Sequence, residues 1–204
     1  MDVHNVTADA ETFTCNAYLT AGDAPTLVDA GSMEGVVDVV RKHTDDLEAV
    51  ALTHQHGDHV ASLDAVCEAF DPDEVYAYAN HPRRTTAIDD GDTIEIGGET
   101  FEVVFTPGHA DDHVSFVSET TLFSGDVVVH NDGAFDYGSF GRTDMPGQSR
   151  ERLIEGIEAL LAQMGDTVEH MYAGHGDAFH GDVRDLVETA LERAEKREPK
   201  YPDE

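Results

Sequence analysis

The sequence predicts a mixed α/β domain in which two packed β-sheets are covered by outer helices. Strand-like segments fall into two runs, and helical segments flank the strands on both sides. No repeat with a period of about 20–50 residues is visible, which argues against a solenoid. With 204 residues, of which 40% are hydrophobic, the chain is long enough for one continuous core. We therefore expect a single domain over 1–197, followed by a frayed tail over 198–204.

The first run of strands lies in the N-terminal half. The turn AGDA separates the first two strands, and apolar residues at helical spacing mark the helices between the later ones. In chain order we expect strands over 11–20, 25–31, 47–53 and 74–79, with helices over 33–43 and 60–70.

The second run begins with a hairpin whose turn is the Gly-Gly pair at 97–98. A loop rich in Gly, Phe and Asp over 131–147 separates the later strands from a long helix. In chain order we expect strands over 93–96, 99–106, 113–118, 120–126 and 168–174, with helices over 149–164 and 181–197.

The charge is strongly negative, with 43 acidic against 12 basic residues and a formal net charge of −31. The acidic residues are scattered along the chain, so a disordered acidic tail does not account for them. Such a field repels phosphate backbones and argues against a nucleic-acid partner. The composition resembles that of proteins from organisms that keep molar salt in the cytoplasm; an ordinary acidic protein is the alternative.

Other features indicate a cytoplasmic protein without a membrane partner. No apolar run approaches the ~20 residues that a membrane span needs. The first residues lack the basic and apolar regions of a secretory signal. Cys15 and Cys67 match no CxxC spacing, so we expect two buried apolar side chains.

Potential metal ligands recur in loops that directly follow predicted strands. The segment THQHGDH contains His54, His56, Asp58 and His59, and later strand ends contribute a further three residues. Those three residues are His109, Asp126 and His175. Five histidines and two aspartates are too many for one tetrahedral zinc but suit two metals that share one carboxylate.

THQHGDH resembles the T-H-x-H-x-D-H signature of the metallo-β-lactamase superfamily. TPGHADDH, LFSGD and YAGHG resemble its later motifs in the same order, so the resemblance covers roughly residues 11–180. It implies a four-layer αββα sandwich with a dinuclear site, of two zinc ions or alternatively of iron or manganese. By the resemblance, one ion binds His54, His56 and His109, the other binds Asp58, His59 and His175, and Asp126 bridges them.

This resemblance implies a hydrolase in which a metal-bridging hydroxide attacks the substrate. Asp58 and Asp126 would be the catalytic residues, because they hold that hydroxide in place. His113 and His130 lie near the motifs and are candidates for orienting a ligand. Asp29 is expected to make structural hydrogen bonds in a loop near the site.

The segment YGSFGRTDMPG over 137–147 resembles a loop of single-domain glyoxalase II-like proteins, the hydroxyacylglutathione hydrolase group. The resemblance implies a small-molecule thioester substrate, with Arg142 contacting the thiol carrier and Tyr137 and Phe140 lining the acyl pocket. A structural ion pair of Arg142 is the alternative. Two-domain glyoxalase II enzymes carry a C-terminal helical domain that helps to grip glutathione. This sequence ends after a single helix, so we expect no such domain, and a small thiol other than glutathione is a further alternative.

Rival functions remain within the same superfamily. Persulfide dioxygenases share the G-R-T-D loop but use one iron, and their last histidine lies in a P-A-H-D pattern, whereas this chain reads YAGHGD. A lactonase is another alternative. Charge argues against a phosphodiester nuclease, and the intact ligand set argues against a non-catalytic metal-binding protein. The metal, the acyl group, the thiol and the oligomeric state stay open.

Overall fold

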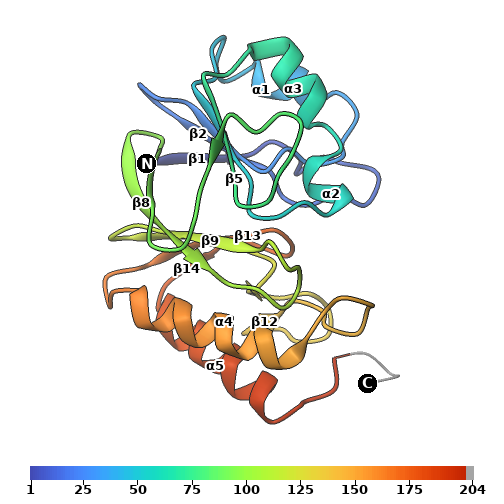
Figure 1. Cartoon of the computed structure of the whole chain (residues 1–204), viewed down its shortest axis with the longest axis vertical. Coiled ribbons are helices and arrows are strands. Elements are labelled where there is room, and N and C mark those ends of the chain that lie inside the picture. Colours follow the sequence, from blue (N-terminus) through green and yellow to red (C-terminus); the bar gives the residue numbers. More distant parts are fainter. Residues whose placement is uncertain (201–204) are drawn as a thin grey trace. The chain divides into compact units, whose positions relative to one another are not determined.

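The computed structural model describes residues 1–200, and the chain forms two compact units (Figure 1). The first unit comprises Met1–Asp89 and Thr93–Phe101. The second comprises Asp90–Asp92 and the chain from Glu102 onward. The two predicted runs of strands correspond to two six-stranded sheets, and each unit has helices of its own.

The first unit contains a mixed sheet with the strand order β1-β2-β3-β4-β5-β6. Its strands are β1 (Asp2–Asn5), β2 (Tyr18–Ala21), β3 (Thr26–Val28), β4 (Ala49–Ala51), β5 (Glu74–Ala77) and β6 (Thr86–Ala87). Strands β1 to β3 pair antiparallel, whereas β3 to β6 pair parallel. Because parallel strands end at the same edge of a sheet, the loops after β3 and β4 lie side by side.

Three helices belong to the first unit: α1 (Val36–Val40), α2 (Gly57–Val60) and α3 (Leu63–Phe70). One face of α1 and of α3 packs on the sheet, where Val36 and Val66 join Leu27 and Val50 in a buried apolar cluster. Helices α1 and α3 alternate with parallel strands, the arrangement that buries the apolar faces of both.

Residues of the second unit form most of the other sheet, whose strand order is β14-β13-β10-β9-β8-β7. Its strands are β7 (Thr93–Ile96), β8 (Glu99–Phe105), β9 (Val114–Val117), β10 (Thr121–Gly125), β13 (His170–Ala173) and β14 (Phe179–His180). A small hairpin of β11 (Val128–Val129) and β12 (Ser139–Phe140) accompanies it.

Helices α4 (Arg150–Gln163) and α5 (Val183–Glu195) pack beside each other on this sheet (Figure 1). Leu153 and Ile157 of α4 and Leu186 of α5 are fully buried together with Met171 of β13. Both helices begin at side-chain caps, since Ser149 accepts a hydrogen bond from the Arg152 amide and Asp182 accepts one from the Asp185 amide.

Several predicted boundaries are wrong. Of the expected strand over 11–20 only β2 forms, because before it the Thr7 hydroxyl bonds the backbone of Cys15 and Ala17 in place of a strand ladder. The expected helix over 33–43 is shorter, since Gly35 takes a left-handed conformation (φ 83°) directly before α1. Strands β1, β6 and β14 were not expected, because they are short and contain polar residues. They are recognised as strands only by their pairing at a sheet edge.

The remaining expectations concern the chain ends, the cysteines and the membrane. Residues 198–200 of the expected tail are described, and Lys200 is buried; 201–204 lie outside the described residues. Both cysteines are buried and form no disulfide, as expected. Within residues 1–200, no helix combines the length and the apolar character that crossing a membrane requires.

Candidate metal centre

The first unit brings four of the predicted ligands together around the start of α2. The loop after β4 carries His54 and His56, and α2 itself carries Asp58 and His59. The Nε2 atom of His54 lies 3.0 Å from Nδ1 of His56, and the ring centroids of His54 and His59 are 4.0 Å apart. The Nε2 atom of His59 lies 3.9 Å from a carboxylate oxygen of Asp58. Four donors of the kind that zinc and iron bind therefore gather around the start of α2.

Asp29 fixes this loop from the end of β3. It is buried, and its carboxylate accepts hydrogen bonds from the Thr53 amide (2.9 Å) and the Thr53 hydroxyl (2.8 Å). One carboxylate oxygen also lies 2.9 Å from Nδ1 of His59. Asp29 adopts a left-handed φ of 58°, a conformation that aspartate tolerates better than most residues. The predicted structural role of Asp29 is confirmed.

The second unit brings the other three predicted ligands together. Asp126 follows β10, His109 follows β8, and His175 follows β13. The Nε2 atoms of His109 and His175 lie 3.3 and 3.4 Å from the same oxygen of Asp126, Oδ2. One carboxylate thus faces two imidazoles from different strand ends.

Close backbone packing holds this trio in place. A Cβ atom on Gly141 would lie 2.0 Å from the carbonyl oxygen of Asp126, so only glycine lets the loop pass there. The next residue in that loop, Arg142, offers its carbonyl oxygen to Nδ1 of His109 at 3.0 Å. On the other side of His109, a Cβ atom on Gly108 would lie 2.3 Å from the backbone nitrogen of Leu153. Both glycines therefore allow the close backbone packing that positions His109.

His113 supports Asp126 through the backbone. Its Nε2 accepts a hydrogen bond from the Asp126 amide at 2.9 Å, and its Nδ1 lies 2.8 Å from the Thr106 hydroxyl. The ring is fully buried, so these contacts also determine its tautomer, with the proton on Nδ1. His130 lies elsewhere, in an aromatic cluster with Tyr137 and Phe179.

The donor chemistry in each unit suits a metal cation. Nδ1 of His109 faces a carbonyl and Nδ1 of His59 faces a carboxylate; both partners only accept, so Nδ1 carries the proton. In a neutral ring the lone pair is then on Nε2, which faces a carboxylate oxygen of Asp126 or Asp58 respectively. Two facing acceptors repel unless a proton or a metal ion lies between them. A bond from the Nδ1 proton to a carbonyl or carboxylate oxygen is how proteins usually orient metal-binding histidines.

The predicted substrate-binding residues lie between β11 and α4, with Phe140 in β12 and Tyr137 and Arg142 in the loops on either side of that strand. Arg142 forms a bidentate pair with Asp144, with both N–O distances at 2.8 Å, and these hydrogen bonds lower the pKa of the Asp144 carboxyl. Tyr137 donates a hydrogen bond to Asp185, and burial together with that bond raises its pKa to about 12. The ring of Phe140 is fully buried in the core of the second unit. Their roles toward a substrate stay predictions.

Two residues of the site were missed by the sequence reasoning. Thr53 ties Asp29 to the histidine loop, and its hydroxyl also lies 3.1 Å from Nδ1 of His54. Thr106 holds His113. For Thr53 the signal was present, since this residue opens the THQHGDH motif. Thr106 gave the same signal, since it opens the TPGHADDH motif.

Comparisons with known proteins agree with these motifs. The family model of the metallo-beta-lactamase superfamily matches residues 10–201. A probable metallo-hydrolase of Streptococcus pyogenes serotype M6 is 32% identical over 185 residues, covering 78% of this chain and 77% of that protein. A hydroxyacylglutathione hydrolase of Francisella philomiragia is 38% identical, but over 95 residues, 45% of this chain. The match spans 38% of that hydrolase's length, well under half.

Solved structures share the fold. The structure of ETHE1 from Myxococcus xanthus matches with a TM-score of 0.71 at 22% identity, covering 93% of this chain and 89% of that one. The protein TTHA1623, solved in a di-iron-bound form, matches with a TM-score of 0.65 at 26% identity, covering 87% and 91%. The predicted fold class, the mixed α/β fold of the metallo-β-lactamase type, is confirmed. By its sequence, its fold and its ordered histidine motifs, the chain belongs to the metallo-β-lactamase superfamily.

Proposed function

We propose that the chain is a metal-dependent hydrolase of small-molecule thioesters, with two divalent ions held by seven ligands. The observation that carries the proposal is the orientation of His59 and His109. Each ring is anchored through Nδ1, which leaves the Nε2 lone pair directed toward the carboxylate of Asp58 or Asp126. Such anchoring is typical of metal-binding histidines, in which the second ring nitrogen is bonded and the first is left to face the ion.

The proposed assignment follows the family motifs. His54, His56 and His109 bind one ion; Asp58, His59 and His175 bind the other; Asp126 binds both. Zinc is the first choice for imidazole and carboxylate donors. Iron is the alternative, since a relative at 26% identity was solved with two iron ions.

When bound, two such ions lower the pKa of a water molecule toward neutrality and polarise an acyl oxygen. The protein's own contribution is positional. Asp126 is held by the His113 ring through its backbone amide, and Gly141 keeps the neighbouring loop against its carbonyl. Asp58, on α2, would accept a hydrogen bond from the attacking water. No serine or cysteine nucleophile is needed.

A thioester substrate is supported by two features of the sequence. The hydroxyacylglutathione hydrolases compared are 33–38% identical over about half of this chain, and the loop GSFGRTD resembles the loop of that group. The side chain of Arg142 is 42% exposed, so it can exchange Asp144 for a substrate carboxylate. The acyl group and the thiol remain for experiment to identify.

A direct test compares hydrolysis with oxidation. Protein loaded separately with zinc and with iron is given lactoyl thioesters and persulfides of glutathione and of γ-glutamylcysteine. The proposal expects the zinc form to consume thioester without oxygen uptake. Oxygen uptake with a persulfide by the iron form, with thioesters inert, would instead establish the persulfide dioxygenase alternative.

Variants connect the activity to the proposed ligands. Asp126→Asn should lower both metal content and thioester hydrolysis, because a shared carboxylate loses its charge. Asp166→Asn is the matched control, since it removes the same charge from a side chain that is 92% exposed. Full activity of Asp126→Asn with one tightly bound ion would contradict the dinuclear assignment.

A further inference from the structure

The hairpin of β13 and β14 carries a second pair of histidines, separate from the proposed ligands. His170 and His180 are directly opposite each other in the antiparallel register. Side chains in such positions share one face of the sheet. Their Nδ1 atoms lie 2.9 Å apart, with ring planes inclined by 75°. Two nitrogen donors therefore meet at the base of the hairpin whose loop carries His175.

We propose that His170 and His180 form a peripheral binding site for a tetragonal divalent transition-metal ion, Cu²⁺ or Ni²⁺. Two imidazole nitrogens bound at ~2.0–2.1 Å lie about 2.9 Å apart when they subtend a right angle at the metal, and about 3.4 Å apart at a tetrahedral angle. The observed separation matches the right angle. Square-planar or tetragonal geometry is typical of Cu²⁺ and Ni²⁺, whereas zinc favours the tetrahedron.

The tautomers suit this role. The Nδ1–Nδ1 contact requires that at least one of the two nitrogens is unprotonated and presents its lone pair. For His170 that nitrogen is favoured by Glu169, whose carboxylate lies 3.7 Å from Nε2 and so draws the ring proton to that side. The side chain of His170 is 40% exposed and His180 is also exposed, so both rings can adjust about their χ2 torsions to receive an ion.

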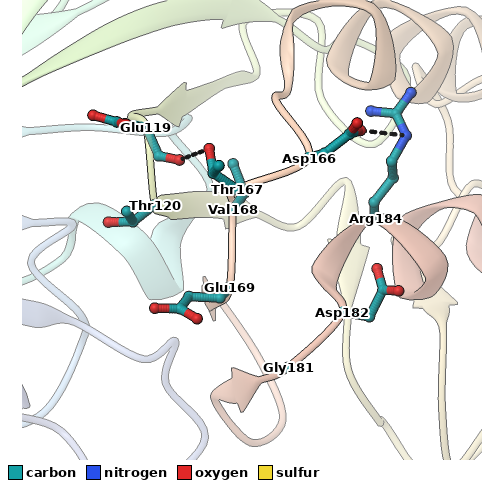
Figure 2. Close-up of a pocket in the computed structure, with 9 residues that line it drawn as sticks. All are labelled: Glu119, Thr120, Asp166, Thr167, Val168, Glu169, Gly181, Asp182 and Arg184. Atoms are coloured by element: carbon teal, nitrogen blue, oxygen red, sulfur yellow. Dashed lines mark hydrogen bonds and ion pairs between the residues drawn. The ribbon is translucent and has the colours of Figure 1, made fainter.

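The surroundings attract cations. A pocket of about 620 Å³ is lined by chain neighbours of the pair, with Glu169 preceding His170 and Gly181 and Asp182 following His180 (Figure 2). Glu119 and Asp166 add two more carboxylates to its lining.

Arg184 is the one basic residue lining this pocket, and its guanidinium is already engaged. It lies 3.6 Å from Asp166 and 3.3 Å from Glu188, and it donates to the carbonyl oxygens of Leu161 and Met164. The pocket therefore keeps a surplus of negative charge that raises the local concentration of divalent ions.

Another histidine pair in the first unit shows what the proposed site requires. His4 and His43 are stacked face to face, with ring centroids 4.1 Å apart and planes inclined by 28°. Lone pairs lie in the ring plane, so stacked rings do not direct them to one point. This pair provides controls with the same residue type on the same protein.

The test uses the full chain, first saturated with zinc and then equilibrated with Cu²⁺. Cu²⁺ binds nitrogen donors more tightly than zinc, so copper that replaces zinc is counted separately from the zinc released. We expect the wild type to take up about one more Cu²⁺ per chain than His170→Asn or His180→Asn, beyond the copper that replaces zinc. The EPR spectrum should show nitrogen superhyperfine splitting that each variant removes. Either substitution should weaken Cu²⁺ binding about tenfold or more, whereas His43→Asn should leave it unchanged.

Further measurements keep the outcome unambiguous. Equal thermal midpoints without copper would show that the variants are folded. Copper uptake that is the same in the wild type and both hairpin variants would overturn the proposal, and so would an excess uptake in the wild type that is matched by an equal excess loss of zinc. A signal lost in His4→Asn but kept in His170→Asn would assign the copper to the chain's N-terminus and would also overturn it.

Discussion

Substituting Asp29 by asparagine should reduce metal binding while leaving the fold nearly intact. The asparagine oxygen can still accept from the Thr53 amide, and its NH₂ group can donate to both the Thr53 hydroxyl and Nδ1 of His59. To accept that bond, Nδ1 must give up its proton. The proton moves to Nε2, the atom that faces Asp58 and that a metal would need.

Alanine at the same position has a different expected effect. It leaves two buried donors, the Thr53 amide and Nδ1 of His59, without their acceptor. The Thr53 hydroxyl can still turn to Nδ1 of His54, at 3.1 Å. At about 1–3 kcal/mol for each unsatisfied group, Asp29→Ala should lower the free energy of unfolding by about 2–6 kcal/mol.

The two variants distinguish an effect on the His59 tautomer from an effect on the free energy of unfolding. Denaturant unfolding of the metal-free proteins should place Asp29→Asn within about 1 kcal/mol of the wild type and well above Asp29→Ala. Zinc titration should show affinity about 10–100-fold weaker in Asp29→Asn. Asp9→Asn, an exposed aspartate of the same unit, is the matched control. Wild-type zinc affinity in Asp29→Asn would refute the orientation argument.

Further predictions concern salt, pH and packing. Screening shortens the range of charge repulsion to about 3 Å at 1 M salt. At a net charge of −31, the thermal midpoint at saturating metal should therefore rise between about 0.1 and 2 M KCl. An unchanged midpoint would contradict the expectation that the protein is adapted to molar salt. Burial raises the pKa of Asp132, but the hydrogen bond and charge of Lys200 outweigh it and leave the pKa below its usual 3.8. The stabilisation is therefore full above pH 3.8 and lost as pH falls through the lower folded value, and Asp132→Asn should flatten this part of the stability–pH curve. Gly141→Ala should destabilise the protein by at least about 1–3 kcal/mol and lower metal content, because the new Cβ overlaps the Asp126 carbonyl; Gly165→Ala, with only ordinary contacts, should do neither.

Most strand and helix segments could be predicted because their apolar spacing is local. The ends of these segments could not be predicted where a single contact determines them. Gly35 has a left-handed backbone conformation, so α1 begins only after it. The Thr7 hydroxyl bonds the Cys15 carbonyl and the Ala17 amide, which the strand expected over 11–20 would have paired with another strand. Strands β1, β6 and β14 exist only because a neighbouring strand offers hydrogen bonds at the sheet edge.

By itself the sequence determined the identity of the seven proposed ligands, their order along the chain and their place in loops at strand ends. Residue type and local pattern are enough for that. Only the tertiary structure decided which nitrogen the rings of His59 and His109 present. Asp29 orients His59, the Arg142 carbonyl orients His109, and His113 holds Asp126, each across at least 13 residues of sequence. Such bonds depend on the path of the folded backbone, which brings together groups that no local pattern relates.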